Sequence, residues 1–193
     1  MAIAQGRQFI DSIGGVLRRG GVGILPTDTL YGIVGSALNK KTVEKIYRLR
    51  KRNPKKPMII LIGSIRDLAR FGVVLSGADK KILRSLWPGS VSVILPARAR
   101  IFSYLHRGTK TLAFRLPKDR WLRLLLLKTG PLVAPSANWE GKPPAKTIAA
   151  AKKYFKDRVD FYIDSGRRDV KPSTIISLAS GTVTVLRRGA VKI

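Results

Sequence analysis

The sequence predicts one α/β domain over residues 1–193, built on a twisted, open, mixed sheet that is flanked by helices. Three observations lead to this prediction. Short apolar runs bounded by Gly and Pro alternate with segments of helical periodicity. Several of these runs follow one another without a helix between them, which argues against a regular doubly wound fold. Finally, 45% of the 193 residues are hydrophobic, enough for one packed core.

Helices are expected where apolar residues recur at a spacing of three and four. The first is stopped by Gly20 and Gly21, and the second carries Val43, Ile46 and Tyr47 on one side and a very basic outer face. The expected helices span residues 3–19, 40–52, 65–71, 78–86, 120–128 and 147–155.

Strands are expected at short, mostly continuous apolar runs, which are typical of buried strands. Pro26 ends the first of them, and the tight segment 27–31 separates it from the second. The expected strands span residues 22–25, 32–38, 57–62, 90–96, 111–116, 132–134, 161–163, 173–178 and 183–186.

Composition excludes several classes of protein. Without Cys there is no disulfide, thiolate metal site or Cys nucleophile, and the single His106 argues against a multi-His zinc site. No phosphate loop, dinucleotide fingerprint or GxSxG elbow is present. The longest aliphatic run, residues 124–127, is far shorter than the ~20 residues of a membrane span. Because the N-terminus lacks the apolar region of a signal peptide, a cytoplasmic protein is expected.

The charge is strongly unbalanced, with 38 Lys and Arg against 11 Asp and Glu and a net charge of +27. Such an excess attracts polyanions such as tRNA, rRNA or acidic lipid. A general basic bias, or adaptation to a salty or nucleic-acid-crowded interior, would give the same composition. Charge alone therefore leaves an RNA partner open.

Polar residues gather in loops that follow or precede the expected strands. PTDTLYG, residues 26–32, offers Thr27, Asp28 and Thr29 beside freed backbone N–H groups, although a simple Asx or ST turn would also need them. PSAN, residues 135–138, contributes Ser136 and Asn138 in a rigid loop. Ser136 is a weak candidate nucleophile because the chain offers no His partner except His106. These loops are predicted to bind a ligand.

Cations occur in unusual places. Nine Lys and Arg lie between Lys40 and Lys56 with one acid, and the run continues past the expected helix into a Pro-bounded loop. A solvated helix face is the ordinary explanation, whereas guanidiniums in that loop suit bidentate phosphate binding. Arg115 interrupts an apolar strand, and its burial costs several kcal/mol unless it meets an acid or a ligand anion. Taken together, the segments predict a pocket for a small anionic molecule such as a nucleotide.

The ordered motifs PTDTLYG, the basic run before KP, WPGSVS, FRLP, PSANWEGKP, PST and LRRG resemble those of the YrdC-like threonylcarbamoyl-AMP synthase family from Gly20 to Ala190. The resemblance implies a twisted mixed α/β fold with a large positively charged cavity. It implies synthesis of L-threonylcarbamoyl-AMP and pyrophosphate from L-threonine, bicarbonate and ATP, for tRNA modification completed by partner proteins. It also implies a short, single-domain form, and Mg²⁺ that arrives with ATP and is not held by a dedicated protein site.

The resemblance assigns roles to residues of this sequence. Arg50 and Arg52 are the expected catalytic pair. Thr27, Arg115 and Ser173 are expected to bind threonine or bicarbonate. The expected nucleotide contacts are Arg50, Ser92, Ser136, Asn138 and Arg187. No metal ligand is assigned, although Asp28 is the one acid nominated near Mg²⁺.

Several residues depart from the family pattern. Arg50 stands where Lys is usual, and Ser92 where Thr is usual. Trp139 and Glu140 replace Leu and Ser, and Pro144 stands where Ser is common. Ser90 for Pro and Ser177 for Asp complete the list.

Two alternatives accompany this interpretation. One is a non-catalytic module of the same fold that binds tRNA or rRNA, which the charge favours. The other is a carbamoyl-adenylate-forming domain of a hydrogenase-maturation protein, against which the lack of flanking zinc-binding Cys segments argues.

Overall fold

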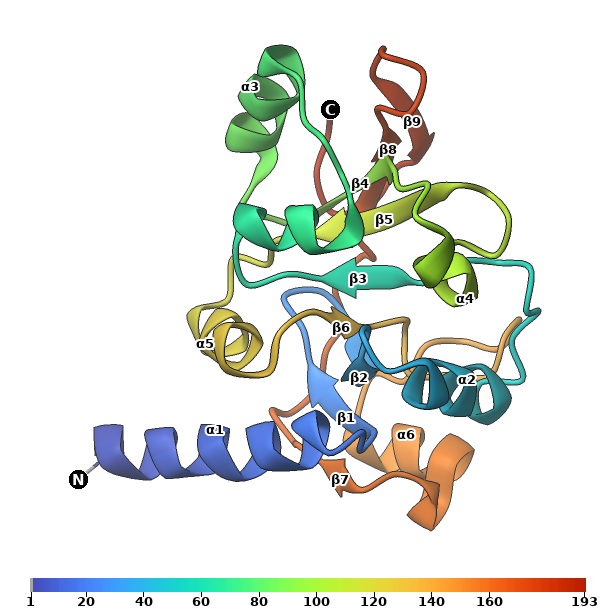
Figure 1. Cartoon of the computed structure of the whole chain (residues 1–193). Coiled ribbons are helices and arrows are strands. Elements are labelled where there is room, and N and C mark those ends of the chain that lie inside the picture. The colour runs from blue at the N-terminus through green and yellow to red at the C-terminus, as the bar shows by residue number, and fades with distance from the viewer. Residues whose placement is uncertain (1) are drawn as a thin grey trace.

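A computed structural model describes residues 2–193, with side chains described from Gln8 onward (Figure 1). Nine strands of the described chain form one mixed sheet in the order β7-β1-β2-β6-β3-β5-β4-β8-β9. The strands are β1 (Gly23–Pro26), β2 (Tyr31–Ser36), β3 (Ile59–Leu61), β4 (Val91–Pro96), β5 (Thr111–Arg115), β6 (Leu132–Val133), β7 (Phe161–Tyr162), β8 (Thr174–Ser177) and β9 (Thr184–Arg187). Three pairs are parallel, β1 with β7, β3 with β5 and β4 with β8, and the others are antiparallel.

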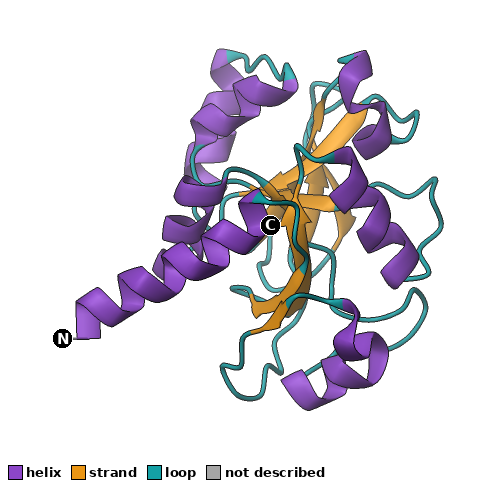
Figure 2. Ribbon diagram, turned by 60° about the horizontal axis from the view of Figure 1, so that its bottom comes forward, coloured by secondary structure: helices purple, strands orange, loops and turns teal. Residues whose placement is uncertain are grey.

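Helices lie on both sides of this sheet (Figure 2). The α-helices are α1 (Ala2–Arg18), α2 (Lys40–Leu49), α3 (Gly77–Leu86), α4 (Ser103–His106), α5 (Arg120–Thr129) and α6 (Ile148–Phe155). Three 3₁₀ helices complete the described elements: η1 (Ile65–Phe71), η2 (Arg100–Phe102) and η3 (Lys156–Arg158).

Alternation of side chains along the strands builds two cores. In β3, Ile60 joins the larger core with α2 and η1, while its neighbour Leu61 joins a smaller core with α1 and α5. The same division separates Ile33 from Val34 in β2, as expected for successive residues of a strand. The sheet is therefore covered by apolar residues on both faces, which holds the loops at its strand ends in place.

The predicted fold class and the order of the predicted elements are confirmed. The prediction missed η2 and α4, and it placed the end of the second helix at residue 52, three residues too late. The helix stops in a Schellman turn: Lys51 has φ +50°, and the amides of Lys51 and Arg52 donate to the carbonyls of Arg48 and Tyr47. This turn takes Arg52 out of the helix.

No helix in residues 2–193 is long and apolar enough to cross a membrane.

Candidate functional site

Two adjoining cavities lie at the ends of the central strands, with volumes of about 450 Å³ and about 330 Å³. They share the wall formed by Ile59, Pro135, Ser136 and Arg187. The first cavity is lined from the β1–β2 turn, the end of β5 and the segment before β8. The second is lined from the loop after α2 and from β3, β4, β5 and β8. Loops at strand ends are where α/β sheets commonly bind ligands.

The β1–β2 turn presents two buried hydroxyl groups to the first cavity. Thr27 Oγ1 donates to the Leu30 carbonyl at 2.7 Å and lies 3.2 Å from Thr29 Oγ1. The amides of Thr27 and Thr29 are also bonded within the turn. PTDTLYG is thus both an ST turn and part of the cavity wall, so the two interpretations of this motif hold together.

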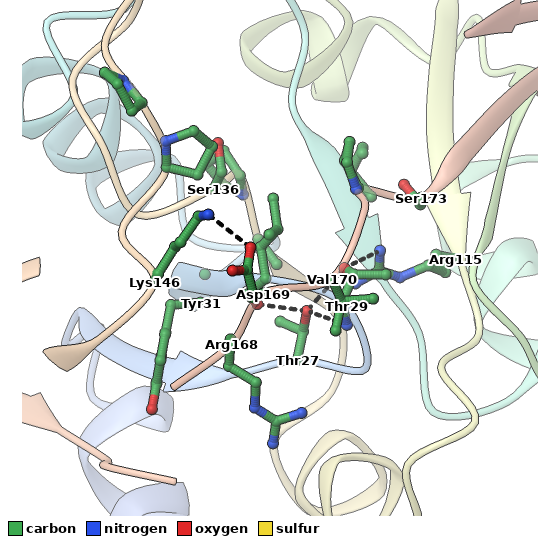
Figure 3. Close-up of a pocket in the computed structure, with 18 of the residues that line it drawn as sticks. Thr27, Thr29, Tyr31, Arg115, Ser136, Lys146, Arg168, Asp169, Val170 and Ser173 are labelled. Carbon is green, nitrogen blue, oxygen red and sulfur yellow. Dashed lines mark hydrogen bonds and ion pairs between the residues drawn. The ribbon is translucent and has the colours of Figure 1, made fainter. Parts of the chain in front are cut away.

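Arg115 ends β5 and is only 3% exposed. Its Nη2 lies 3.1 Å from Asp28 Oδ1. Its Nη1 donates to Thr29 Oγ1 at 3.2 Å (Figure 3). Asp28 also accepts from Ser90 Oγ at 3.2 Å. Burial lowers the pKa of the Arg115 guanidinium, which the Asp28 carboxylate opposes and the Arg187 charge reinforces. Of the two anions that the sequence left open for Arg115, the protein supplies one itself.

Arg50 is buried behind the second cavity and holds the PSAN loop. Its Nε donates to the carbonyls of Ser136 and Asn138 at 2.9 and 3.1 Å, and its Nη2 donates to Ser136 Oγ and Asn138 Oδ1 at 3.3 and 3.4 Å. Nη1 is buried without a hydrogen-bond partner among the described residues. Burial, assisted by the Arg52 charge, lowers the pKa of Arg50 to about 10, so the group stays protonated at neutral pH.

Arg52 lies in the loop after α2 and also lines the second cavity. Its Nε and Nη2 donate to the carbonyls of Lys56 and Pro57 at 3.1 and 2.8 Å. These bonds fix the guanidinium plane against its own loop, and Nη1 makes no hydrogen bond to the described part of the chain. The second cavity is lined by three arginines, Arg50, Arg52 and Arg187, and by no Asp or Glu of the described residues.

Ser136 and Asn138 are adjacent but differently placed. Ser136 lines both cavities and is half-buried. Asn138 lines neither: its Nδ2 donates to the carbonyls of Trp139 and Lys142 at 2.7 Å each, and its Oδ1 accepts from Arg50. The Asn138 side chain therefore shapes the loop, and the nucleotide contact expected of it stays a prediction.

Ser92, Ser173 and Arg187 form a chain of contacts at the β4–β8–β9 side. The hydroxyl oxygens of Ser92 and Ser173 lie 2.9 Å apart, and both residues are buried. Arg187 donates from Nη2 to the Ser173 carbonyl at 2.8 Å and to its hydroxyl at 3.3 Å. Ser173 and Arg187 line the first cavity, whereas Ser92 lies behind Ser173. Partial burial lowers the pKa of Arg187.

Sequence reasoning missed one wall of the first cavity, formed by Lys146 and by residues 168–170 of the segment before β8 (Figure 3). Lys146 Nζ lies 2.6 Å from Asp169 Oδ1, and the Arg168 amide donates to the Lys146 carbonyl at 2.7 Å. The Tyr31 hydroxyl donates to the Gly166 carbonyl at 2.7 Å. The only signal in the sequence was a polar, irregular stretch, DSGRRDVKPS, between two expected strands.

The described residues do not offer a metal centre. No group of three or more His, Asp or Glu is placed to hold an ion. Asp28, the acid nominated near Mg²⁺, is paired with Arg115 and Ser90 and lines neither cavity.

The two cavities are thus lined by arginines and small hydroxyls. Thr27, Arg50, Arg52, Arg115, Ser136, Ser173 and Arg187 all line one or both cavities, as the sequence predicted. His106 lines neither cavity, so Ser136 has no histidine base there. The described lining residues hold arginines and hydroxyls and no nucleophilic triad.

Comparison with known proteins identifies the family. A family model described as "Telomere recombination", which covers Sua5, YciO and YrdC, matches residues 15–189. The threonylcarbamoyl-AMP synthase of Thiobacillus denitrificans is 36% identical over 171 residues, 86% of this chain and 89% of that protein. The synthase of Laribacter hongkongensis is 34% identical over 86% of this chain and 90% of its own length. The chain belongs to the Sua5/YciO/YrdC family.

Solved structures agree with this assignment. The structure of Pyrococcus abyssi Sua5 complexed with L-threonine superposes with a TM-score of 0.83 at 28% identity. The superposition covers 93% of this chain and 54% of the Sua5 chain, so this chain spans about half of that protein. Escherichia coli YciO, at 23% identity, has the same fold, with a TM-score of 0.84 over 96% of this chain and 91% of its own.

Proposed function

We propose that the protein is an L-threonylcarbamoyladenylate synthase, a nucleotidyltransferase that converts L-threonine, bicarbonate and ATP into threonylcarbamoyl-AMP and pyrophosphate. One observation carries the proposal: the second cavity, lined by Arg50, Arg52 and Arg187 and by no acid of the described residues, adjoins the first cavity with its buried hydroxyls and the paired Arg115. The family membership and the names of the relatives support this activity.

The amino acid belongs in the first cavity under this proposal. Thr27 and Ser173 offer hydroxyls to the substrate, and Arg115 offers charge for its carboxylate. The relative complexed with L-threonine has the same fold, which supports a threonine site here. Bicarbonate would meet the substrate amine in the same cavity.

The triphosphate belongs in the second cavity. Nη1 of Arg52 makes no hydrogen bond to the described residues and is free to bind phosphate. Arg187 and Ser136 lie on the wall that the two cavities share. Three positive side chains gather there, which favours a ligand of high negative charge. Arg50 contributes charge from behind the PSAN loop, and Asn138 and Ser92 contribute through the residues they hold.

The chemistry then needs positioning more than acid–base groups. The threonine amine and bicarbonate form a carbamate with loss of water. A carbamate oxygen attacks the α-phosphorus of ATP, and the bond from that phosphorus to the bridging oxygen of pyrophosphate breaks. No covalent bond to the protein forms. Arg52, Arg187 and Arg115 hold mutually repelling anions at bonding distance and stabilise charge on the transferring group.

Mg²⁺ would enter as part of the MgATP substrate. The described residues offer no cluster of acids for it, and Asp28 is committed to Arg115. Phosphate oxygens and water are the ligands that Mg²⁺ prefers in such sites. The product would pass to tRNA-modification proteins in the cytoplasm, where ATP and tRNA are found.

Incubation of the purified protein with ATP, bicarbonate and threonine tests the activity. We expect pyrophosphate release that depends on threonine, and a threonylcarbamoyl-AMP product detected by mass spectrometry. The alternative of a non-catalytic RNA-binding module rests on the net charge of +27. RNA binding that weakens steeply with salt, without any threonine-dependent product, would favour that alternative.

A further inference from the structure

Glu140 joins two loops that contribute to the lining of the second cavity, the loop after α2 that carries Arg52 and the loop after β6 that carries PSAN. It stands in the PSAN loop, yet its Oε2 accepts from the Asn53 amide at 2.5 Å and its Oε1 accepts from Lys56 Nζ at 2.9 Å. Its own amide donates to the Arg50 carbonyl at 2.8 Å. Three contacts from one residue thus tie the PSAN loop to the loop that carries Arg52.

The neighbouring residue adds a fourth contact. Lys51 Nζ lies 3.9 Å from the centre of the Trp139 ring, a cation–π geometry. Lys51 has a left-handed backbone, which is strained for a residue other than Gly. The Trp139 contact therefore offsets strain at the turn that points Arg52 out of α2. Trp139 is fixed in turn by an edge contact with Tyr154, with ring centres 5.4 Å apart.

The turn at residues 53–57, which Glu140 binds, also holds the Arg52 guanidinium. Arg52 donates to the carbonyls of Lys56 and Pro57, and Glu140 binds the same turn at Asn53 and Lys56. If this turn moves, the carbonyls that orient Arg52 move with it. The donations from the Asn53 amide and Lys56 also lower the pKa of Glu140, which keeps it ionised at neutral pH.

We propose that Glu140, assisted by Trp139, is a positioning residue that holds Arg52 in place to bind the phosphates of the substrate. The inference deepens the proposed function and rests on it for the identity of the substrate.

An ordinary surface ion pair is the simpler explanation, and such pairs contribute little. The two explanations differ because Glu140 accepts from a backbone amide. The Asn53 amide proton should exchange slowly with solvent in the wild type and quickly in Glu140→Ala. Glu44 provides a matched control, since it is the other Glu of the chain, pairs with Arg107 at 2.8 Å and is comparably exposed.

The test compares Glu140→Ala and Glu140→Gln with Glu44→Ala, using inorganic tripolyphosphate and L-threonine as separate ligands in calorimetry. We expect Glu140→Ala to raise the Kd for tripolyphosphate at least tenfold, to change the Kd for threonine less than twofold, and to speed exchange at Asn53. Glu140→Gln should fall between, because its amide oxygen still accepts from Asn53 but lacks the charge that Lys56 needs. Glu44→Ala should leave both affinities unchanged.

Turnover separates this inference from the proposed function. For an active enzyme, Glu140→Ala should raise the KM for ATP by the same factor and leave kcat within threefold. Wild-type protein that binds tripolyphosphate but makes no product would overturn the synthase proposal and leave the brace standing. Unchanged tripolyphosphate affinity in both Glu140 variants would overturn the brace, as would a weakened affinity in Glu44→Ala of the same size. Should Glu140→Ala fail to fold, Glu140→Gln decides the matter.

Discussion

The two adjoining cavities differ in how their positive charges are balanced. In the first, Arg115 is paired with Asp28 and Lys146 with Asp169. In the second, the arginines are held by carbonyl, hydroxyl and amide oxygens, and no acid of the described residues lines the wall. The first cavity therefore meets two of its four cations with acids and leaves Arg168 and Arg187 over, whereas the second has three arginines and no acid among its described lining residues.

This difference separates two kinds of ligand. A cavity with buried hydroxyls, and with acids as well as cations in or beside its wall, suits a zwitterion such as an amino acid, because each of its charges can meet one of opposite sign. A cavity lined by cations and by no acid suits a polyanion, because the ligand then supplies the negative charge. Ser136 and Arg187 stand on the shared wall, where the two ligands would meet.

The largest expected effect comes from removing the acid of the buried ion pair beside the first cavity. Asp28→Asn leaves the Arg115 guanidinium buried without its acid, and removing one partner of a buried pair typically costs about 3–5 kcal/mol. We expect a loss of unfolding free energy of that order in urea titration. The double variant Asp28→Leu with Arg115→Met should recover most of this stability, because both charges are gone.

The double variant also tests the role of Arg115. Recovered stability without threonine binding in calorimetry would agree with a carboxylate contact by Arg115. Threonine binding at the wild-type affinity would show that the Arg115–Asp28 pair serves the fold alone, and the comparison of the two cavities would lose its functional meaning.

In the second cavity, the expected loss is of activity and not of stability. Arg52→Ala removes the guanidinium that has a nitrogen free for phosphate, and we expect threonine-dependent pyrophosphate release to fall at least ~100-fold, about 2.7 kcal/mol of transition-state stabilisation. The melting temperature should change little, since the side chain is not buried. Arg48→Ala, an exposed arginine of α2, is the matched control. Turnover unchanged in Arg52→Ala would remove this residue from the mechanism.

Much of the fold was predictable because its signals are local. Apolar runs bounded by Gly or Pro mark the strands, and loops at strand ends gave Thr27, Ser136 and Ser173. Arg115 was found because a charge within an apolar strand must have a partner. The end of α2 was misplaced because Lys51 occupies a left-handed position that usually signals itself by Gly.

The sequence does not reveal which acceptor each hydrogen-bond donor of the site binds. It placed Arg50 and Asn138 near the site, but only the structure shows that their side chains are bonded mainly to each other and to the loop backbone. Lys146 and Asp169 were missed because they lie in irregular segments without apolar spacing, and their pairing depends on how the chain crosses the cavity.

A smaller effect is expected where Ser173, in the wall of the first cavity, contacts Ser92 of β4. Ser173→Ala removes the partner of the Ser92 hydroxyl in a buried place, and leaving a buried hydroxyl without its partner costs about 1–3 kcal/mol. The double variant Ser92→Ala with Ser173→Ala should be less destabilised than the two single losses together. Ser85→Ala, at an exposed position of α3, should be neutral. Strict additivity in urea titrations would mean that the two hydroxyls do not interact.

The smallest effect concerns the acid that stands outside the second cavity and ties its loops. The Asn53 amide and Lys56 lower the pKa of Glu140 below its unfolded value of about 4.3. A depressed carboxyl pKa stabilises the folded state above the unfolded pKa, and this stability is lost as the pH falls through the folded pKa. The difference in unfolding free energy between wild type and Glu140→Gln should therefore be constant from pH 7 to about pH 5 and shrink below that, measured by urea titration at each pH. A difference that stays constant down to pH 3 would mean that the charge of Glu140 plays no part in tying the two loops. Arg52 would then be held in the second cavity without the help of that charge.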